Sequence, residues 1–429
     1  MPDSAPTVLI LGGITTLARP LALYFLNSSP PLASFVRIAD RFTISPPSTY
    51  LDRPFRELLQ TDQLEYQQIN LSNVARHAEL LTHETKGFDV VYDLTGEMGF
   101  DKSEITQISN THSLALSLAT SALEPAVRPK AYIRLTYSYY EMKSLASSSA
   151  GHTESADLKP DGVRGRWWHE TLRGLGALRE KGLNVGVIRA GAWYGPGMWG
   201  GEVVPRLVAG QVYQYLKEEM KFLYNSDLRI NTIHTTDLAQ SLHLLSLYLL
   251  KPNPALVKIP FSFPPPPASS FLLKDKRSSV SDVWKTTPLV VNPDVEVSLP
   301  LFNVVDSANS TQGDLGKAVA EVWGIKYGFL NATMAMLVQQ FAKTDFTEMI
   351  EDVNEMHVEA WSKMLAASDP PIESTPITPF LDEHAFRKMA ICLDGSRARL
   401  LLGFKPAHPR VEVAELRAIV KGFQEEGIW

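Results

Sequence analysis

The chain has 429 residues, of which 45% are hydrophobic and 21% charged, the balance of a soluble globular protein with two or three folding units. A net charge of -6 argues against nucleic acid or an anionic membrane as the main partner. The single cysteine excludes an internal disulfide and a cysteine-based zinc site, and we predict no metal. Because no apolar stretch is long enough to span a bilayer and no leader peptide is evident, we expect a cytoplasmic protein.

The first predicted unit is a strand, a glycine turn and a helix. Val8–Leu11 is an apolar run typical of a strand buried on both faces, and apolar residues then return at helical spacing. In a dinucleotide-binding fold, the turn between strand and helix lets the backbone approach a pyrophosphate. The alternative is an ordinary α/β turn without a ligand. The turn residues that we predict to bind a cofactor are Gly12, Gly13, Thr15 and Leu17.

A second strand, residues 34–40, ends on an acidic residue. In a dinucleotide-binding fold, a carboxylate at this distance from the turn binds the adenosine ribose and repels a 2′-phosphate, so Asp40 favours NAD over NADP. Arg41 follows directly and is able to hold a 2′-phosphate instead, which leaves NADP open. A third strand, residues 64–71, carries Asn70 where a contact to the adenine edge is expected.

Further strands are predicted at residues 88–94, 129–135 and 183–190, and helical patterns alternate with them. This alternation predicts a Rossmann-type α/β fold with a doubly wound parallel sheet. Threonine, serine and tyrosine hydroxyls follow the strand at residues 129–135. In open α/β sheets, ligands bind at this carboxyl end of the strands.

Four segments together carry a resemblance to a known family. They are Gly12-x-x-Thr-x-x-Ala18, Asp40, Ile188-Arg-Ala-Gly-Ala-Trp-Tyr-Gly-Pro196 and Thr232-Ile-His-Thr-Thr-Asp-Leu-Ala239. They resemble the extended short-chain dehydrogenases/reductases, the NAD-dependent epimerase/dehydratase-like proteins. The resemblance covers residues 7–248 and resumes at 302–306 and 311–323. It implies NAD or NADP as cofactor and a small-molecule substrate, and a homodimer is compatible with it.

The resemblance also implies a division into domains. We predict an NAD(P)-binding domain at residues 1–250, with 191–225 contributing to the substrate side. Residues 251–300 are rich in proline, serine and lysine, so we predict an inserted loop that buries little surface. Residues 301–429 are mostly helical in pattern and are expected to form a smaller domain that acts as a substrate lid.

The catalytic pattern of the family is incomplete in this chain. The resemblance implies a Ser or Thr on the fifth strand, a tyrosine acid/base, and a lysine that holds the nicotinamide ribose. Thr136 matches the first. Anchoring the next helix on Glu170 places Gly162 and Arg166 in the tyrosine and lysine positions. We therefore predict Tyr140 as the replacement acid, with Arg166 binding the ribose and supporting the phenolate.

Two classes of function follow. The first is an atypical extended short-chain dehydrogenase/reductase that uses NAD(P) for oxidoreduction or epimerisation of a small carbonyl or hydroxyl substrate or a nucleotide sugar. In it, His169 is an alternative base to Tyr140. The second is a catalytically impaired, NAD(P)-binding regulatory or scaffold protein, because a fold does not guarantee chemistry.

Overall fold

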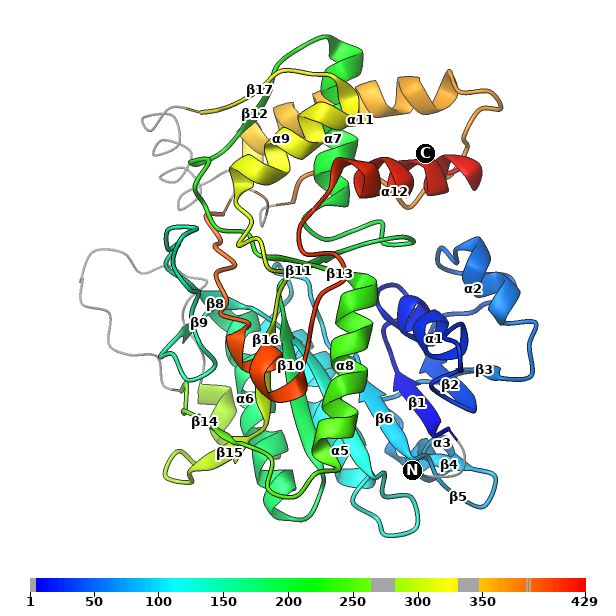
Figure 1. Ribbon diagram of the computed structural model, residues 1–429, viewed down its shortest axis with the longest axis vertical. Helices are drawn as coiled ribbons and strands as arrows, with labels where there is room; N and C mark the ends of the chain where they lie inside the picture. Colours follow the sequence, from blue (N-terminus) through cyan, green and yellow to red (C-terminus); the bar gives the residue numbers. More distant parts are fainter. Residues whose placement is uncertain (1–4, 264–281, 331–346, 383–384, 386) are drawn as a thin grey trace.

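The computed structural model describes residues 5–263, 282–330, 347–382, 385 and 387–429. One part is a parallel sheet with helices on both faces, and a mostly helical part lies beyond the carboxyl ends of the strands (Figure 1). No helix among the described residues combines the length and apolar character needed to cross a bilayer.

The large sheet has seven strands in the order β16-β10-β7-β6-β1-β2-β3, and every neighbouring pair is parallel. The strand order reverses at β1, which is where open α/β sheets bind ligands. The predicted Rossmann-type fold is confirmed. The strands are β1 (Thr7–Leu11), β2 (Phe35–Asp40), β3 (Leu64–Gln68), β6 (Val90–Asp93), β7 (Ala131–Tyr137), β10 (Val185–Ala190) and β16 (Leu301–Val304).

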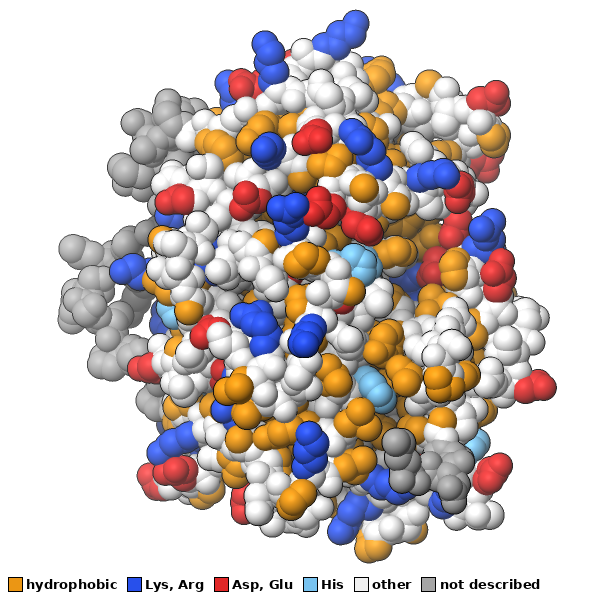
Figure 2. Space-filling view, viewed as in Figure 1, with side chains coloured by type: hydrophobic (Ala, Val, Ile, Leu, Met, Phe, Trp, Pro, Cys, Tyr) orange, Lys and Arg blue, Asp and Glu red, His pale blue; other side chains and the backbone are white. Residues whose placement is uncertain are grey.

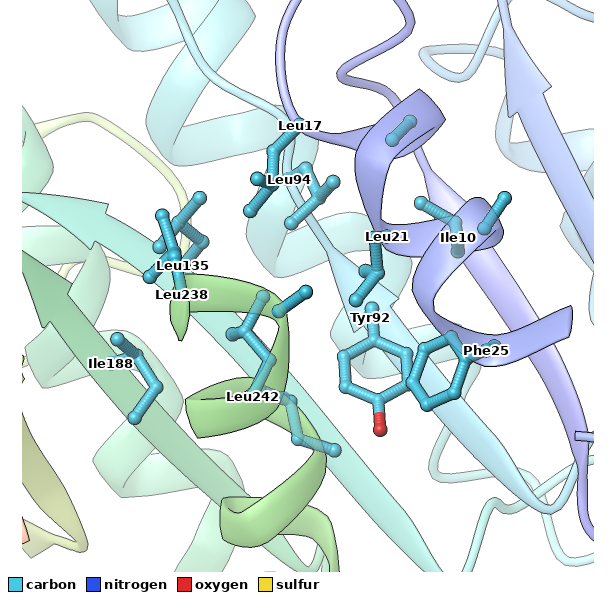
Figure 3. Close-up of a cluster of buried hydrophobic side chains, with 14 of the residues drawn as sticks. Ile10, Leu17, Leu21, Phe25, Tyr92, Leu94, Leu135, Ile188, Leu238 and Leu242 are labelled. Carbon is cyan, nitrogen blue, oxygen red and sulfur yellow. The ribbon is translucent and has the colours of Figure 1, made fainter. Parts of the chain in front are cut away.

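Helices cover both faces of this sheet. On one face, α1 (Ala18–Leu26) and α8 (Thr235–Leu249) pack over Ile10 and Tyr92 (Figure 3). On the other face, α5 (Leu114–Ser121) and α6 (Gly162–Glu180) pack over Leu9 and Tyr132. Neighbouring strand residues point to opposite faces. The uninterrupted apolar run at residues 8–11 is thus the pattern of a strand buried on both sides.

Short elements connect these layers. They are α2 (Arg53–Leu58), α3 (His77–Leu80), α4 (Glu104–Gln107), β4 (Thr82–His83), β5 (Lys86–Gly87), β8 (Tyr140–Glu141), β9 (Lys159–Pro160), β11 (Ala192–Tyr194), β12 (Met220–Phe222) and β13 (Thr232–His234).

The helical part combines segments that are distant in sequence. Its elements are α7 (Val204–Leu216), α9 (Gln312–Trp323), α11 (Thr347–Ala366), α12 (Val413–Glu425) and β17 (Tyr327–Phe329), which pairs with β12. Leu207, Leu315, Trp361 and Leu416 share one hydrophobic cluster, so α7 packs together with the C-terminal helices. Figure 2 shows one face of the whole molecule. Acidic and basic side chains are interspersed over the described residues of that face, without a broad basic patch.

The ends of the proline-rich segment belong to the folded core. β14 (Val257–Ile259) and β15 (Val297–Leu299) form an antiparallel pair, and their alternate residues are buried beside α6. Arg173 of α6 donates to the carbonyl oxygens of Ile259 at 2.9 Å and Val295 at 2.9 Å. The prediction that residues 251–300 bury little surface is therefore wrong for both ends. Residues 264–281 lie outside the described part.

Candidate cofactor and catalytic site

The turn after β1 requires glycine at two successive positions. Gly12 and Gly13 have φ values of +71° and +77°, the left-handed region that favours glycine. A Cβ on Gly12 would lie 3.0 Å from Thr95 Cγ2, and one on Gly13 would lie 2.9 Å from Leu94 Cβ. The turn therefore packs directly against the segment that follows β6, at the point where the strand order reverses.

Backbone donors gather between this turn and α1. The Ile14 N–H donates to Asp40 Oδ2 at 3.0 Å. Across the described chain, the N–H groups of Gly13, Thr15 and Leu17 have no hydrogen-bond acceptor. Free N–H groups at the start of a helix, with the helix dipole behind them, form a site for an anion such as phosphate. This donor set fits the pyrophosphate of a dinucleotide.

Asp40 lies at the end of β2, beside the glycine turn. Besides Ile14, its carboxylate accepts a hydrogen bond from the Arg41 N–H at 2.6 Å, and burial raises its pKa while these two bonds oppose the change. The Ile69 N–H donates to the Asp40 carbonyl oxygen at 2.8 Å. The next residue, Asn70, is exposed at the same edge of the sheet. The structure thus brings Asp40 to the glycine turn and Asn70 to the neighbouring strand end, beside Asp40.

The predicted catalytic hydroxyls lie on the α6 face of the sheet. Thr136 is buried in β7 and lies opposite Arg189 of β10 in the strand register. The Arg189 guanidinium stands 4.6 Å from the ring centroid of Tyr140, and its Nη2 donates to the Tyr140 hydroxyl at 3.4 Å. The structure therefore groups Thr136 and Tyr140 around Arg189.

Tyr140 also forms a hydrogen bond with His169 of α6. The Tyr140 hydroxyl lies 3.0 Å from His169 Nδ1, and His169 Nε2 lies 2.6 Å from the Pro260 carbonyl oxygen. A carbonyl oxygen can only accept a hydrogen bond, so Nε2 carries the imidazole proton and Nδ1 accepts a hydrogen bond from the Tyr140 hydroxyl. Burial lowers the pKa of His169 to about 4, which keeps the ring neutral. Tyr140 is only 4% exposed.

Arg166 is not brought to Tyr140. It lies on α6 with 4% of its surface exposed, its Nη1 has no partner within the described residues, and burial lowers its pKa while Glu141 and Glu104 oppose the change. Arg189 has the place beside the phenol that Arg166 was predicted to take. The sequence signal for Arg189 is the Ile188-Arg-Ala segment.

Trp168 fills the space between α6 and the segment after β6. Its indole N–H donates to the Glu97 carbonyl oxygen at 2.9 Å, and a Cβ on Gly96 would lie 2.4 Å from the indole ring. Its ring meets those of Tyr137 and Tyr139 edge to face, with centroids 5.2 and 5.5 Å apart. Aromatic side chains therefore occupy the carboxyl edge next to β7.

Glu170 joins α6 to the segment after β14. Its Oε1 accepts from the Ser262 N–H at 3.0 Å and from the Ser262 hydroxyl at 2.8 Å, while Arg173 lies 3.3 Å from Oε2. Burial is the largest influence, and it raises the pKa of Glu170 to about 7 despite these contacts. This carboxyl thus binds its proton more tightly in the folded chain than in the unfolded chain.

The raised pKa of Glu170 predicts a pH-dependent stability. The stabilising contribution of its proton is complete below the ordinary pKa of 4.5 and is lost as pH rises through about 7. Glu170→Gln should remove this dependence, worth on the order of a few kcal/mol, and gain stability relative to the native chain at pH 8. Urea unfolding at pH 5 and pH 8 measures the effect. Parallel pH curves for the two proteins would contradict it.

One group of potential metal ligands is present in the described chain. Single ligand atoms of His234, His408 and Glu415 lie within 4.8 Å of one another. The two imidazole rings are stacked, with centroids 3.8 Å apart, so one ion is not able to lie in both ring planes. His234 Nδ1 accepts from the Thr236 N–H, which places the ring proton on Nε2. These features do not fit a metal centre.

Two cavities, of about 380 and 230 Å³, lie along the second half of α6. Their lining includes Asn184 in the first and Gly174 in the second, and neither is lined by the glycine turn, Thr136 or Tyr140.

No family model and no curated relative matches the sequence. Solved structures do match over nearly its whole length. A UDP-glucose 4-epimerase from Thermotoga maritima with UDP-glucose has a TM-score of 0.58 at 12% identity, covering 98% of this chain and 99% of the other. A dTDP-glucose 4,6-dehydratase from Streptomyces venezuelae with NAD has a TM-score of 0.59 at 14% identity, covering 98% and 97%. A UDP-glucuronic acid 4-epimerase from Bacillus cereus, with UDP-glucuronic acid and NAD, scores 0.56 at 12% identity.

The chain has the fold of the extended short-chain dehydrogenases/reductases. This confirms the fold expected from the four sequence segments. At 11 to 14% identity the likeness concerns the fold, and the chemistry must be argued from the residues of this chain.

Proposed function

We propose that this protein binds NAD along the carboxyl edge of its large sheet. The observation that carries the proposal is the set of free N–H groups at Gly13, Thr15 and Leu17 beside the buried carboxylate of Asp40. The N–H groups suit the pyrophosphate, and the carboxylate suits the ribose hydroxyls. The same carboxylate disfavours a 2′-phosphate, which supports NAD over NADP.

We further propose that the protein oxidises, reduces or epimerises a nucleotide sugar or a similar small hydroxyl substrate. The solved structures with this fold include enzymes for UDP-glucose and UDP-glucuronic acid. The helical part, with α7, α9 and α12, stands over the same edge of the sheet and is able to contact such a substrate (Figure 1).

Bound NAD would supply the hydride acceptor or donor, and the chain would supply the proton chemistry. Thr136 would orient the substrate oxygen. Tyr140 would deliver the proton: burial raises the pKa of its phenol, and the Arg189 guanidinium beside the hydroxyl opposes that rise by favouring the phenolate. His169 is neutral and accepts a hydrogen bond from the same hydroxyl, which it would orient.

The cofactor proposal is tested with Asp40→Ala. The substitution removes the ribose acceptor and the acceptor of the Ile14 N–H, so we expect NADH binding to weaken by about tenfold or more. Calorimetric titration with NADH and NADPH measures the change. Asp40→Asn is the matched variant, because it keeps the size of the side chain and one acceptor oxygen. It removes the negative charge that repels a 2′-phosphate, so it should bind NADPH more tightly than the native chain does. Unchanged affinity of Asp40→Ala for both cofactors would refute the assignment.

A second candidate is an NAD-binding regulatory or scaffold protein without turnover. Two observations favour it. The Tyr140 hydroxyl already donates a hydrogen bond to His169, and Trp168 fills the space beside Gly96. Screening carbonyl compounds and nucleotide sugars with NADH or NADPH separates the two candidates. Tight NADH binding without oxidation by any substrate of these classes would support the second.

A further inference from the structure

Arg19 is a fully buried guanidinium beside the candidate phosphate site. It stands directly after Ala18 at the start of α1, and it is 0% exposed. Its Nε donates to the Ile14 carbonyl oxygen at 2.8 Å, inside the turn that carries the free N–H groups of Gly13 and Thr15. Its Nη2 donates to the Gly197 carbonyl oxygen at 2.8 Å, and its Nη1 pairs with Asp52. Arg19 thus connects three segments across the carboxyl edge.

Two aromatic rings enclose this guanidinium. The Arg19 Cζ atom lies 5.5 Å from the ring centroid of Tyr50 and 5.1 Å from that of Trp199. These rings come from the segment before α2 and from the turn after β11. Because they exclude water, charge interactions of the guanidinium are stronger here than at the surface. A dinucleotide phosphate that contacts Arg19 would therefore be bound more strongly than by an arginine at the surface.

The carboxylate partner belongs to a segment tied to the C-terminal helix. Asp52 directly precedes α2, and the next N–H, of Arg53, donates to Glu426 Oε1 at 2.9 Å. Arg56 lies 3.4 Å from Glu426 Oε2. Glu426 directly follows α12. The Arg19–Asp52 pair therefore sits where the sheet, the α2 segment and the helical part meet.

We propose that Arg19 is a phosphate-binding residue, and that Asp52 holds it in the nucleotide-free chain. The inference rests on the proposed NAD binding. A guanidinium matches phosphate oxygens with two parallel hydrogen bonds, as it matches a carboxylate. A pyrophosphate at the N–H groups of Gly13, Thr15 and Leu17 therefore competes with Asp52 for Arg19. Asp52 is a competing anion in this arrangement and lowers the affinity for the nucleotide.

The competition gives variants with opposite effects. Asp52→Asn removes the competing charge and should tighten the binding of ADP and NADH by about tenfold. Arg19→Met should weaken both by about tenfold or more and reduce the salt dependence of binding. Arg53→Gln is the matched control, because the Arg53 side chain pairs only with the exposed Glu57 among the described residues and should leave both affinities unchanged. Calorimetric titration with ADP and NADH at two salt concentrations measures all three variants.

A double variant keeps the inference testable if a single variant fails to fold. Arg19→Met with Asp52→Leu removes both charges together, which a fold tolerates better than one unpaired buried charge. It should bind ADP about tenfold more weakly than the native chain. Native affinity in the double variant, or no tightening in Asp52→Asn, would make the pair a purely structural contact. If the native chain itself binds neither ADP nor NADH, the proposed NAD binding fails instead.

Discussion

Tyr140→Phe is expected to lose about a hundredfold or more in turnover while retaining NADH binding, because a positioned acid contributes at least that factor. The phenol is the one hydroxyl in the described site that contacts both a guanidinium and a neutral imidazole, at 3.4 and 3.0 Å. In the proposed mechanism, Arg189 would stabilise the phenolate that remains after proton transfer, and His169 would accept the hydrogen bond of the hydroxyl. Removing only the hydroxyl preserves the buried ring and its packing.

Turnover of a substrate found by screening, measured together with NADH affinity, separates chemistry from binding. Tyr248→Phe is a matched control, since that hydroxyl accepts only the Ala255 N–H among the described contacts, at 2.9 Å, and lies away from the site. His169→Ala distinguishes the two candidate acids. Native turnover in Tyr140→Phe would remove Tyr140 from the mechanism, and loss in His169→Ala alone would assign the proton to the histidine.

The geometry of the candidate cofactor site could be predicted from the sequence because its signals are local. The glycine turn, the strand before it and the helix after it lie within twenty residues, and their pattern is that of one folding unit. Asp40 was located by its distance from that turn and by its place at the end of a strand. The structure brings both to one edge of the sheet.

The partner of Tyr140 depends on contacts between distant segments. The residue spacing along α6 predicts Arg166 as the arginine beside Tyr140. The strand register instead brings Arg189 of β10 opposite Thr136 and next to Tyr140. Aligning α6 with the family pattern at Glu170 alone does not determine which of its side chains point toward the sheet. The arginine in Ile188-Arg-Ala could have been considered, but its partner becomes evident only when β7 and β10 are paired.

Average composition misled the prediction for residues 251–300. The proline-rich centre dominates the average, but Val257, Ile259, Val297 and Leu299 alternate with polar residues at the two ends. Each end is too short to stand out alone, and the antiparallel pair buries its alternate residues only through its contact with α6. Replacing the whole segment would therefore remove core side chains, beyond the small entropy change of a loop.

Arg134→Met is expected to cost about 3 to 5 kcal/mol of unfolding free energy, the effect of leaving a buried charge without its partner. Arg134 and Asp93 are both 0% exposed, and Arg134 Nη1 donates to Asp93 Oδ1 at 2.6 Å and to Thr95 Oγ1 at 2.9 Å. The remaining donors to Asp93, the N–H and hydroxyl of Thr95 and the hydroxyl of Tyr132, are neutral and do not replace the guanidinium charge.

Urea unfolding of three variants tests this reading. Lys130→Met breaks the more exposed pair with Asp89, just before β7, and should change stability by no more than about 1 kcal/mol. Arg134→Met with Asp93→Leu removes both buried charges and should recover much of the loss. A single-variant cost no larger than that of Lys130→Met would show that the pair is not desolvated. The Arg134 guanidinium also lies 5.1 Å from the Trp168 ring, so its loss should loosen the tryptophan beside Gly96 and shift its fluorescence.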